Sequence, residues 1–340
     1  MPPIAICIPV RDERRNMAGL IAALAGQRNA GAPVVAMVFD GCHDGSDLVA
    51  AAAAASHGVV LRAESLPRCA SPDAGRARGA ALALGRRIVG AQGMLLTTDA
   101  DTRPASDWVA RSVEVLRGAD LVCGRIERQR HAADVWRVPI EAYLDRLHAV
   151  HRAIDPVAGD ATPSHWQQGG ASLGMTAATW DRLSDETLPA TGEDRALVRA
   201  ARLAGLGVRQ DPAVRVRTSS RLKGRAVGGL ADALRHGRAE AASGNEPMME
   251  HPDDVIARVH RSAVARAAFP PTDVAGLAAQ LGIPAAEVSA AALAATSADA
   301  FATALPPTIG KHRAVSLMQA ARLLERHEHA VQDIALGSAA

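Results

Sequence analysis

The stretch MLLTTDADT at residues 94–102 restricts the fold and chemistry of this chain more than any other. Its opening apolar run, which ends in Thr, predicts the end of a buried strand. Asp99 and Asp101 follow with Ala100 between them, and alternate residues of an extended chain point to the same side. Two carboxylates at one strand end can share one hard divalent cation. The alternative is a solvated turn that contains two Asp residues and binds no metal.

Apolar runs alternate with amphipathic stretches from the N-terminus to residue 216. The apolar runs predict strands at residues 4–10, 33–39, 59–62, 94–98, 121–124 and 208–216. The amphipathic stretches predict helices from residue 16, from residue 48, and over residues 75–89, 108–116, 140–154, 179–183 and 193–203. Strands that alternate with helices favour an α/β, Rossmann-like fold in which a mainly parallel mixed sheet is flanked by helices.

After residue 247 the pattern is helical throughout, with breaks at Pro residues. We therefore expect a boundary within GNEPMMEHP at residues 244–252, between a first domain over residues 1–245 and a helical C-terminal region over residues 246–340. Apolar positions on one face of the helices in this region must be buried, against the first domain or a second subunit. These positions include Leu317, Ala320, Ala321 and Leu324.

The composition excludes some classes of protein. A formal net charge of +2 argues against a nucleic-acid-binding protein, which is usually strongly basic. The four cysteines lack metal-ligand spacing and indicate a reduced, cytoplasmic protein. The sequence shows neither a signal peptide nor an apolar run of about 18 residues that would span a membrane.

Polar clusters follow three of the predicted strands. They are PVRDE at residues 9–13, DGCHDGS at residues 40–46 and DADT at residues 99–102. The carboxyl ends of parallel strands meet at one edge of a sheet, where open α/β folds bind their ligands. The sequence therefore predicts a polar crevice at that edge.

Motifs in these and later segments follow the order that is typical of one enzyme family. The segments are IAICIPVRDE (4–13), VFDGCHDGSDLV (38–49), GRARGAALALG (75–85), LLTTDADT (95–102), WQQGGASLGMTAATWDRL (166–183) and TGEDRALVRAARLAG (191–205). Together they resemble the motifs of family 2 of the GT-A glycosyltransferases, from the N-terminus to residue 230. The resemblance implies a GT-A fold and a glycosyltransferase. Such an enzyme moves a sugar from a UDP- or GDP-sugar to a hydroxyl of a small or lipid-linked acceptor.

The resemblance also assigns residues to the donor and the metal. Glu13 and Asp40 are expected to accept hydrogen bonds from the base and ribose, and Arg78 is expected to lie on the base. Asp99 and Asp101 are expected to hold Mg²⁺ or Mn²⁺ against the diphosphate, where the metal stabilises the leaving group. The donor-binding residues that the resemblance implies are Pro9, Val10, Arg11, Glu13, Asp40, Arg78, Asp99 and Arg221. The alternatives are that Glu13 is a surface charge and that Arg78 pairs with an acid on a helix face.

Transfer to a hydroxyl requires a general base, because a sugar hydroxyl is a poor nucleophile at neutral pH. Asp194 in the GEDR run matches the base of the family, and Glu193 is the next candidate. Both begin a predicted helix, whose dipole helps to keep a carboxylate ionised. With one base and a metal on the leaving group, the resemblance implies single displacement and inversion at the anomeric carbon. The alternative is that both acids only cap the helix.

The stretch RVRTSSRLKGR at residues 215–225 carries several basic side chains close to Gly and Ser. Arg217, Arg221, Lys223 and Arg225 can bind phosphate oxygens of the donor or an anionic acceptor. A solvated basic loop is the alternative. Histidines elsewhere in the chain could add a metal ligand, but none has convincing spacing.

The sequence departs from the family pattern at Phe39, where many relatives carry Asp, at Cys42 instead of Ser, and at Gly79 instead of Asn. These departures leave the identity of the nucleotide open. The Gln-x-x-Arg-Trp element of processive synthases is absent, which favours non-processive transfer. The competing functions are a catalytically inactive protein that binds nucleotide sugars and a metal-dependent phosphatase. The sequence leaves a homodimer open.

Overall fold

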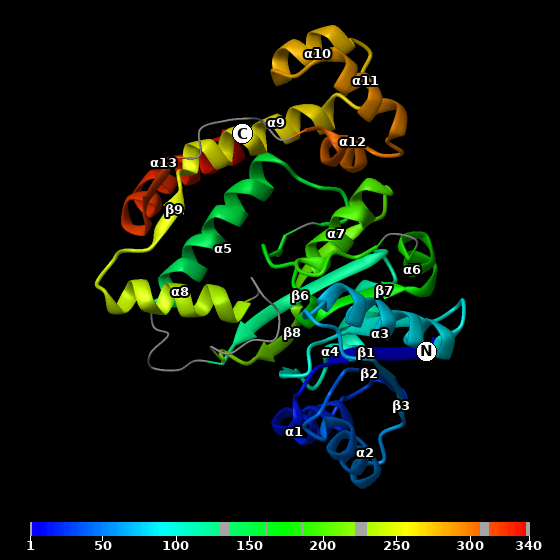
Figure 1. The fold of residues 1–340 in the computed structure, drawn as a ribbon. Helices are drawn as coiled ribbons and strands as arrows, with labels where there is room; N and C mark the ends of the chain where they lie inside the picture. Colours follow the sequence, from blue (N-terminus) through cyan, green and yellow to red (C-terminus); the bar gives the residue numbers. More distant parts are fainter. Residues whose placement is uncertain are drawn as a thin grey trace. The chain divides into compact units, whose positions relative to one another are not determined.

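The computed structural model describes residues 2–129, 136–160, 162–184, 187–221, 230–306 and 313–337. The chain forms two compact units, which Figure 1 colours from blue at the N-terminus to red at the C-terminus. The first unit comprises Met1–His131, Gln167–Ala201 and Leu206–Arg235. The second unit comprises Ala132–Trp166, Arg202–Gly205 and His236–Ala340.

An eight-stranded sheet with the order β3-β2-β1-β4-β7-β6-β8-β5 forms the centre of the first unit. Its strands are β1 (Ile4–Val10), β2 (Val34–Asp40), β3 (Leu61–Leu66), β4 (Met94–Thr97), β5 (Thr102–Pro104), β6 (Leu121–Arg128), β7 (Leu173–Thr176) and β8 (Val208–Thr218). All of them share one direction except β5 and β7, which pair antiparallel with their neighbours. The predicted α/β fold with a mainly parallel mixed sheet is confirmed.

Helices follow most of these strands in the sequence. They are α1 (Arg14–Ala25), α2 (Ser46–His57), α3 (Ala74–Val89), α4 (Trp108–Val115), α6 (Ala177–Leu183), α7 (Glu193–Leu203) and the short 3₁₀ helix η2 (Gly170–Ser172). Helix α8 (Leu230–Ala242) begins in the first unit and ends in the second.

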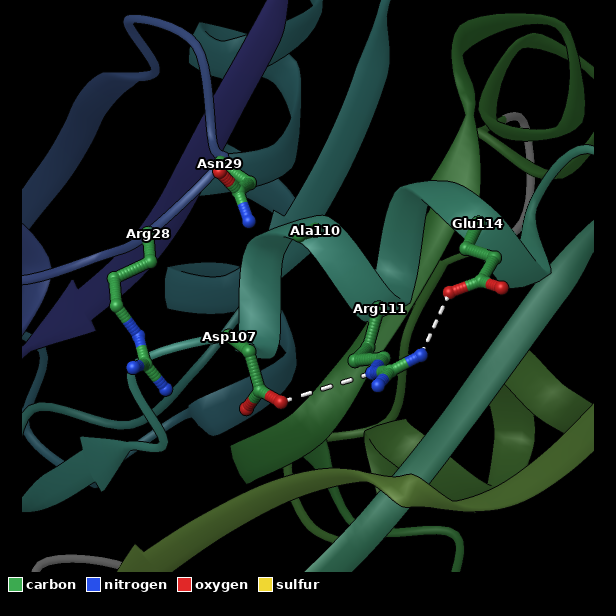
Figure 2. A pocket seen from close by; sticks show the side chains of 6 residues that line it. All are labelled: Arg28, Asn29, Asp107, Ala110, Arg111 and Glu114. Carbon is green, nitrogen blue, oxygen red and sulfur yellow. Dashed lines mark hydrogen bonds and ion pairs between the residues drawn. The ribbon is translucent and has the colours of Figure 1, made fainter.

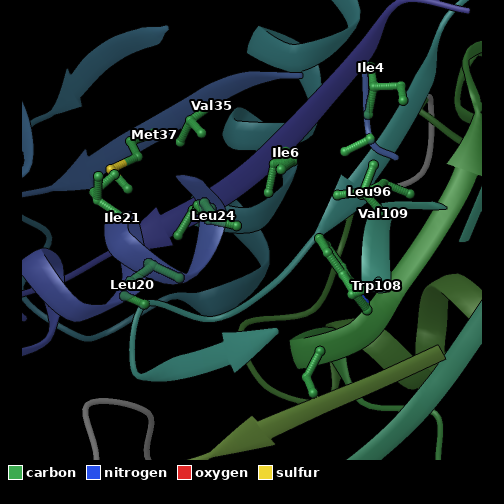
Figure 3. Packing of buried hydrophobic residues seen from close by; sticks show 14 of the residues in the cluster. Ile4, Ile6, Leu20, Ile21, Leu24, Val35, Met37, Leu96, Trp108 and Val109 are labelled. Atoms are coloured by element: carbon green, nitrogen blue, oxygen red, sulfur yellow. The ribbon is translucent and has the colours of Figure 1, made fainter. Parts of the chain in front are cut away.

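One face of β1 carries the largest apolar core of the described residues. Ile4 and Ile6 are buried in a cluster with Leu20 and Ile21 of α1 and with Trp108 of α4 (Figure 3). Because alternate side chains of a strand point to the same side, these isoleucines cover the face that α1 and α4 pack against. The Trp108 indole also donates a hydrogen bond of 3.1 Å to the Ser172 hydroxyl.

The other face of β1 packs against α3 at very short range. Ala5 and Cys7 point to this face, and a Cβ at Gly85 of α3 would lie only 2.3 Å from the Cys7 sulfur. Only glycine allows α3 to lie this close to β1. Since α1 and α4 pack on the opposite face, helices cover both faces of the sheet. The start of α3, where Arg76 and Arg78 lie, is thereby fixed against the sheet.

Several boundaries differ from those predicted. Strand β3 runs from Leu61 to Leu66 rather than over residues 59–62, because it is an edge strand whose side chains are mostly exposed and show little apolar pattern. Strands β5 and β7 are not among the strands predicted from apolar runs. They have three and four residues, which is too few for a periodic signal in the sequence. Among the described residues after position 247, the regular structure is helical except for the short strands β9 (Met248–Glu250) and β10 (Ala314–Ser316), which pair with each other.

The second unit is mainly helical. Its other elements are α5 (Arg137–Ile154), α9 (Pro252–Ala267), α10 (Val274–Leu281), α11 (Ala285–Ala294), α12 (Ala298–Ala304) and α13 (Leu317–Gly337). Leu317, Ala320 and Leu324 of α13 are buried with Tyr143 and Val150 of α5. The apolar positions expected to bury a helix face therefore do so, and Ala321 packs at the edge of the same cluster.

This packing makes the division of the chain differ from the one expected at residue 245. Helix α5 belongs to the second unit because its apolar face is covered by α9 and α13 (Figure 1). The first unit is consequently interrupted in sequence by residues 132–166. Within the described residues, no single helix is long and apolar enough to cross a membrane, and only the pair α10 and α11, bent by 113°, meets that criterion jointly.

Candidate active site

The predicted polar clusters meet at one edge of the sheet in the first unit. Val10 pairs with Phe39 at the end of β1 and β2, and Cys7 pairs with Thr97 at the end of β4. Pro9 and Val10 belong to β1 itself, and Val10 is buried. The residues that follow these parallel strands therefore leave the sheet at its carboxyl edge.

Asp99 and Asp101 are bound by two different arginines. The Asp99 carboxylate accepts a hydrogen bond of 2.8 Å from Nη2 of Arg78. Asp101 lies 3.3 Å from Nε of Arg221, and its side chain is 13% exposed, against 36% for Asp99. Burial raises the pKa of Asp101 to about 6, and the neighbouring Asp99 and Glu13 charges act in the same direction against Arg221. This edge consequently carries closely spaced negative charge.

Arg221 reaches these carboxylates because the end of β8 is tied to the DADT loop. Strand β8 pairs with β5 at Thr102, and the Ser219 amide donates to the Asp101 carbonyl at 3.2 Å. Arg221 then donates to the buried carboxylate of Glu13 at 2.5 Å. Glu13 is thus paired in the interior of the site and is no surface charge.

Arg217, a described residue of the same basic stretch, contacts none of the three carboxylates. Arg217 is 67% exposed and lies 3.6 Å from Glu127, which is the geometry of a solvated pair. Lys223 and Arg225 lie outside the residues that the structure describes.

Asp40 is clamped between two arginines. It is 2% exposed and accepts hydrogen bonds of 2.7 Å from Arg11 and 3.2 Å from Arg76. Arg11 was among the predicted site residues, whereas Arg76 was not. Its position two residues before Arg78 in GRARG was the available signal. Arg76 also donates to the Cys69 sulfur at 2.7 Å.

Glu193 and Asp194 begin α7 and point to different partners. Glu193 is 6% exposed and accepts a hydrogen bond of 3.0 Å from Arg78. Asp194 is half-buried, and its two oxygens accept main-chain N–H bonds from Gly170 at 2.9 Å and Arg195 at 2.8 Å. Asp194 is therefore the carboxylate of the two that keeps some exposure.

Two other features contain none of the site residues named above. Asp12, Cys42 and Asp44 have ligand atoms within 4.8 Å of one another, but both carboxylates already accept hydrogen bonds that hold the turn after β2. Figure 2 shows a pocket of about 670 Å³ beside α4. It is lined by Arg28, Asn29, Asp107, Ala110, Arg111 and Glu114. None of the predicted site residues lines this pocket, so it is not the candidate active site.

Comparisons with known proteins give matches in fold only. No family model matches the sequence, and no curated protein matches it. TarS from S. aureus, solved with UDP-GlcNAc, is 14% identical with a TM-score of 0.49, over 89% of this chain and 82% of that chain. The mannosyltransferase PcManGT from Pyrobaculum calidifontis was solved with GDP-Man and Mn²⁺. It is 18% identical with a TM-score of 0.48, over 89% of this chain and 86% of that chain.

A third similar structure is glucosyl-3-phosphoglycerate synthase from Mycobacterium tuberculosis. It was solved with Mn²⁺, UDP and phosphoglyceric acid. It is 16% identical with a TM-score of 0.44, over 74% of this chain and 84% of that chain.

Proposed function

We propose that the chain is a metal-dependent glycosyltransferase of GT-A family 2, which transfers a sugar from a UDP- or GDP-sugar to an acceptor hydroxyl with inversion and without processivity. One observation carries the proposal. Asp194 binds the amide of Gly170, the carbonyl of Gly170 binds Arg78, and Arg78 binds Asp99. The expected base and the expected metal carboxylate thus belong to one hydrogen-bonded network, which supports the proposal because transfer requires the donor and the acceptor to be held close together.

The donor side of the site fits a divalent cation. Asp99 and Asp101 offer the carboxylate oxygens that Mg²⁺ and Mn²⁺ prefer, and the Arg221 guanidinium already lies between Glu13 and Asp101 as a positive charge. When bound, the metal would supply positive charge for the leaving diphosphate. Arg221 has the guanidinium geometry that suits phosphate oxygens.

The acceptor side needs a carboxylate that can take a proton from a hydroxyl. Each Asp194 oxygen uses one lone pair for a main-chain N–H and retains further acceptor capacity. Glu193 is buried against Arg78, so an acceptor cannot reach it without breaking that pair. Asp194 is the better candidate for the base.

Nucleotide binding and donor turnover test this function. We expect UDP or GDP to bind the purified protein at least about tenfold more tightly with Mn²⁺ than without it, a difference of about 1.4 kcal/mol. One member of a panel of UDP- and GDP-sugars should then lose its sugar to an acceptor or to water. Binding without turnover of any donor would favour the inactive binding protein. Release of phosphate from p-nitrophenyl phosphate would favour a phosphatase, and no binding of either nucleotide would refute the proposal.

A further inference from the structure

Arg78 lies inside the network rather than at a surface on which a nucleotide base could stack. Its side chain is 6% exposed. The guanidinium donates to acceptors from separate segments: Thr97 Oγ1 at 2.8 Å, Asp99 Oδ1 at 2.8 Å, the Gly170 carbonyl at 3.0 Å and Glu193 Oε1 at 3.0 Å. Burial lowers the pKa of Arg78, but Asp99 and Glu193 outweigh this effect and raise it, so the charge is permanent.

Gly170 shows that the surrounding loop is shaped to this guanidinium. A Cβ at position 170 would lie 2.4 Å from Cζ of Arg78, so the backbone can pack on the guanidinium only as glycine. The amide of the same residue donates to Asp194. One peptide segment therefore connects Arg78 with the expected base.

We infer that Arg78 is a positioning residue that sets the spacing between Asp99 and Asp194, and that it makes no contact with the nucleotide base. This inference rests on the proposed function. A planar guanidinium with N–H groups in a fixed fork can satisfy several acceptors at once. An ammonium group is a point charge and would hold only part of the network.

The arginine of this helix that contacts the expected nucleoside-binding carboxylate, Asp40, is Arg76. Its side chain is 31% exposed and lies 3.2 Å from Asp40, which is expected to accept from the base or ribose. Arg76 and Arg78 begin the same helix, so residues two positions apart serve different ends of the site.

The test measures binding of UDP and of pyrophosphate, each with and without Mn²⁺, by calorimetry. Pyrophosphate contains the phosphates but no base, so it separates the two roles. The variants are Arg78→Ala, Arg78→Lys and Gly170→Ala, the last of which displaces Arg78 without removing it. Arg86→Ala is the matched control, because Arg86 lies on the same helix in an exposed pair with Asp181.

We expect metal-free UDP binding to stay within twofold of the wild type in every variant. The gain in affinity that Mn²⁺ gives should fall at least tenfold in Arg78→Ala and Gly170→Ala, for pyrophosphate as well as for UDP. Arg78→Lys should retain part of the gain. Guanidinium chloride at millimolar concentration should restore the gain in Arg78→Ala, which a general loss of structure would not permit.

The opposite pattern would overturn the inference. If Arg78 lies on the base, metal-free UDP binding falls at least tenfold in Arg78→Ala, while Mn²⁺-supported pyrophosphate binding is retained. If Arg78→Ala does not fold, Arg78→Lys and Gly170→Ala give the same comparison. Failure of the wild type to bind either probe with Mn²⁺ would instead refute the proposed function itself, so the two failures can be told apart.

Discussion

The guanidinium of Arg221 binds the carboxylate of Glu13, although 208 positions separate the two residues in the sequence. The same guanidinium lies 3.3 Å from Asp101. Glu13 is buried, and a buried carboxylate is strongly destabilising unless a positive charge accompanies it. Arg221 supplies that charge, so a divalent cation that binds Asp101 has to compete with Arg221.

Arg221→Ala should therefore separate metal binding from nucleotide binding. Without nucleotide, Mn²⁺ should bind the variant about tenfold more tightly than the wild type, because the competing guanidinium is gone (about 1.4 kcal/mol). With Mn²⁺ present, UDP or GDP should bind more weakly, because a donor to the phosphate oxygens is lost. Electron paramagnetic resonance of free Mn²⁺ and calorimetry of the nucleotide measure the two effects.

The matched control for this prediction is Arg217→Ala. Arg217 belongs to the same basic stretch but is 67% exposed, so its removal should leave Mn²⁺ affinity unchanged. Equal Mn²⁺ affinity in Arg221→Ala and the wild type would show that Arg221 and the metal do not compete.

Asp101→Ala should abolish the gain in nucleotide affinity that Mn²⁺ gives, and Asp99→Ala should reduce it less. Asp101 is the more buried of the two carboxylates, and a charged ligand in a desolvated position interacts more strongly with a cation. Calorimetry of UDP and GDP with and without Mn²⁺ checks this. Asp107→Ala, in the pocket of Figure 2, is the control. Metal-supported binding that survives in Asp101→Ala would place the metal elsewhere.

The parts of this fold that the sequence predicts well are those whose pattern is set by burial. Strand β1 was predicted with its observed bounds, Ile4–Val10, because both its faces are covered and nearly every side chain is apolar. Helix α7 was likewise predicted at Glu193–Leu203, because its buried face repeats with the helical period. Strand β3 was displaced because exposed side chains at a sheet edge obey no such pattern.

The pairing of charges could not be predicted in the same way. The resemblance identified Arg78, but its partners come from β4, the DADT loop, η2 and α7, and nothing in the local sequence fixes those distances. Arg76 was missed for the same reason, since its contact with Asp40 spans 36 positions. Local pattern determines elements, whereas tertiary packing determines which of two neighbouring arginines enters the interior.

Acid should destabilise the protein through a buried histidine of the second unit. His148 is 8% exposed, and its Nε2 lies 3.1 Å from the Ser164 hydroxyl. Burial lowers the pKa of His148 to about 3, and nearby positive groups add to this effect. The groups that act on it are Arg152, His151, His165 and, in the opposite direction, Asp145.

The pKa of His148 is about 3 in the folded state and about 6.5 in the unfolded state. At pH values between these two, the unfolded chain binds up to one proton more at His148 than the folded chain. Stability should therefore fall as the pH drops below about 6.5, by up to about 1.4 kcal/mol per pH unit. Urea unfolding at pH 7.5, 6.5 and 5.5 measures this slope. His148→Gln should make it shallower, whereas His57→Gln, at the exposed end of α2, should not. An unchanged slope in His148→Gln would remove this histidine from the acid response.

Asp194→Asn should abolish transfer while nucleotide binding survives. The amide oxygen of Asn can still accept the hydrogen bond from Gly170, whereas its NH₂ group cannot accept the one from Arg195. The link to Gly170 is therefore kept, but the side chain can no longer take a proton from the acceptor hydroxyl. General-base catalysis contributes about 10² to 10⁴-fold, and the rate of donor consumption should fall by at least about 10²-fold. Calorimetry of the nucleotide with Mn²⁺ should stay within twofold of the wild type.

Glu193→Gln is the matched comparison, since the two acids are adjacent and differ in their partners. In the wild type, the Glu193 carboxylate binds Arg78 inside the protein. The substitution should therefore lower the free energy of unfolding by about 2 kcal/mol, which is typical of a hydrogen bond to a charged group. The rate should fall much less than in Asp194→Asn, because the proposed base, Asp194, remains. If Glu193→Gln instead lost the rate without losing stability, and Asp194→Asn kept it, the base would be Glu193 and the acceptor would have to approach from the side of Arg78.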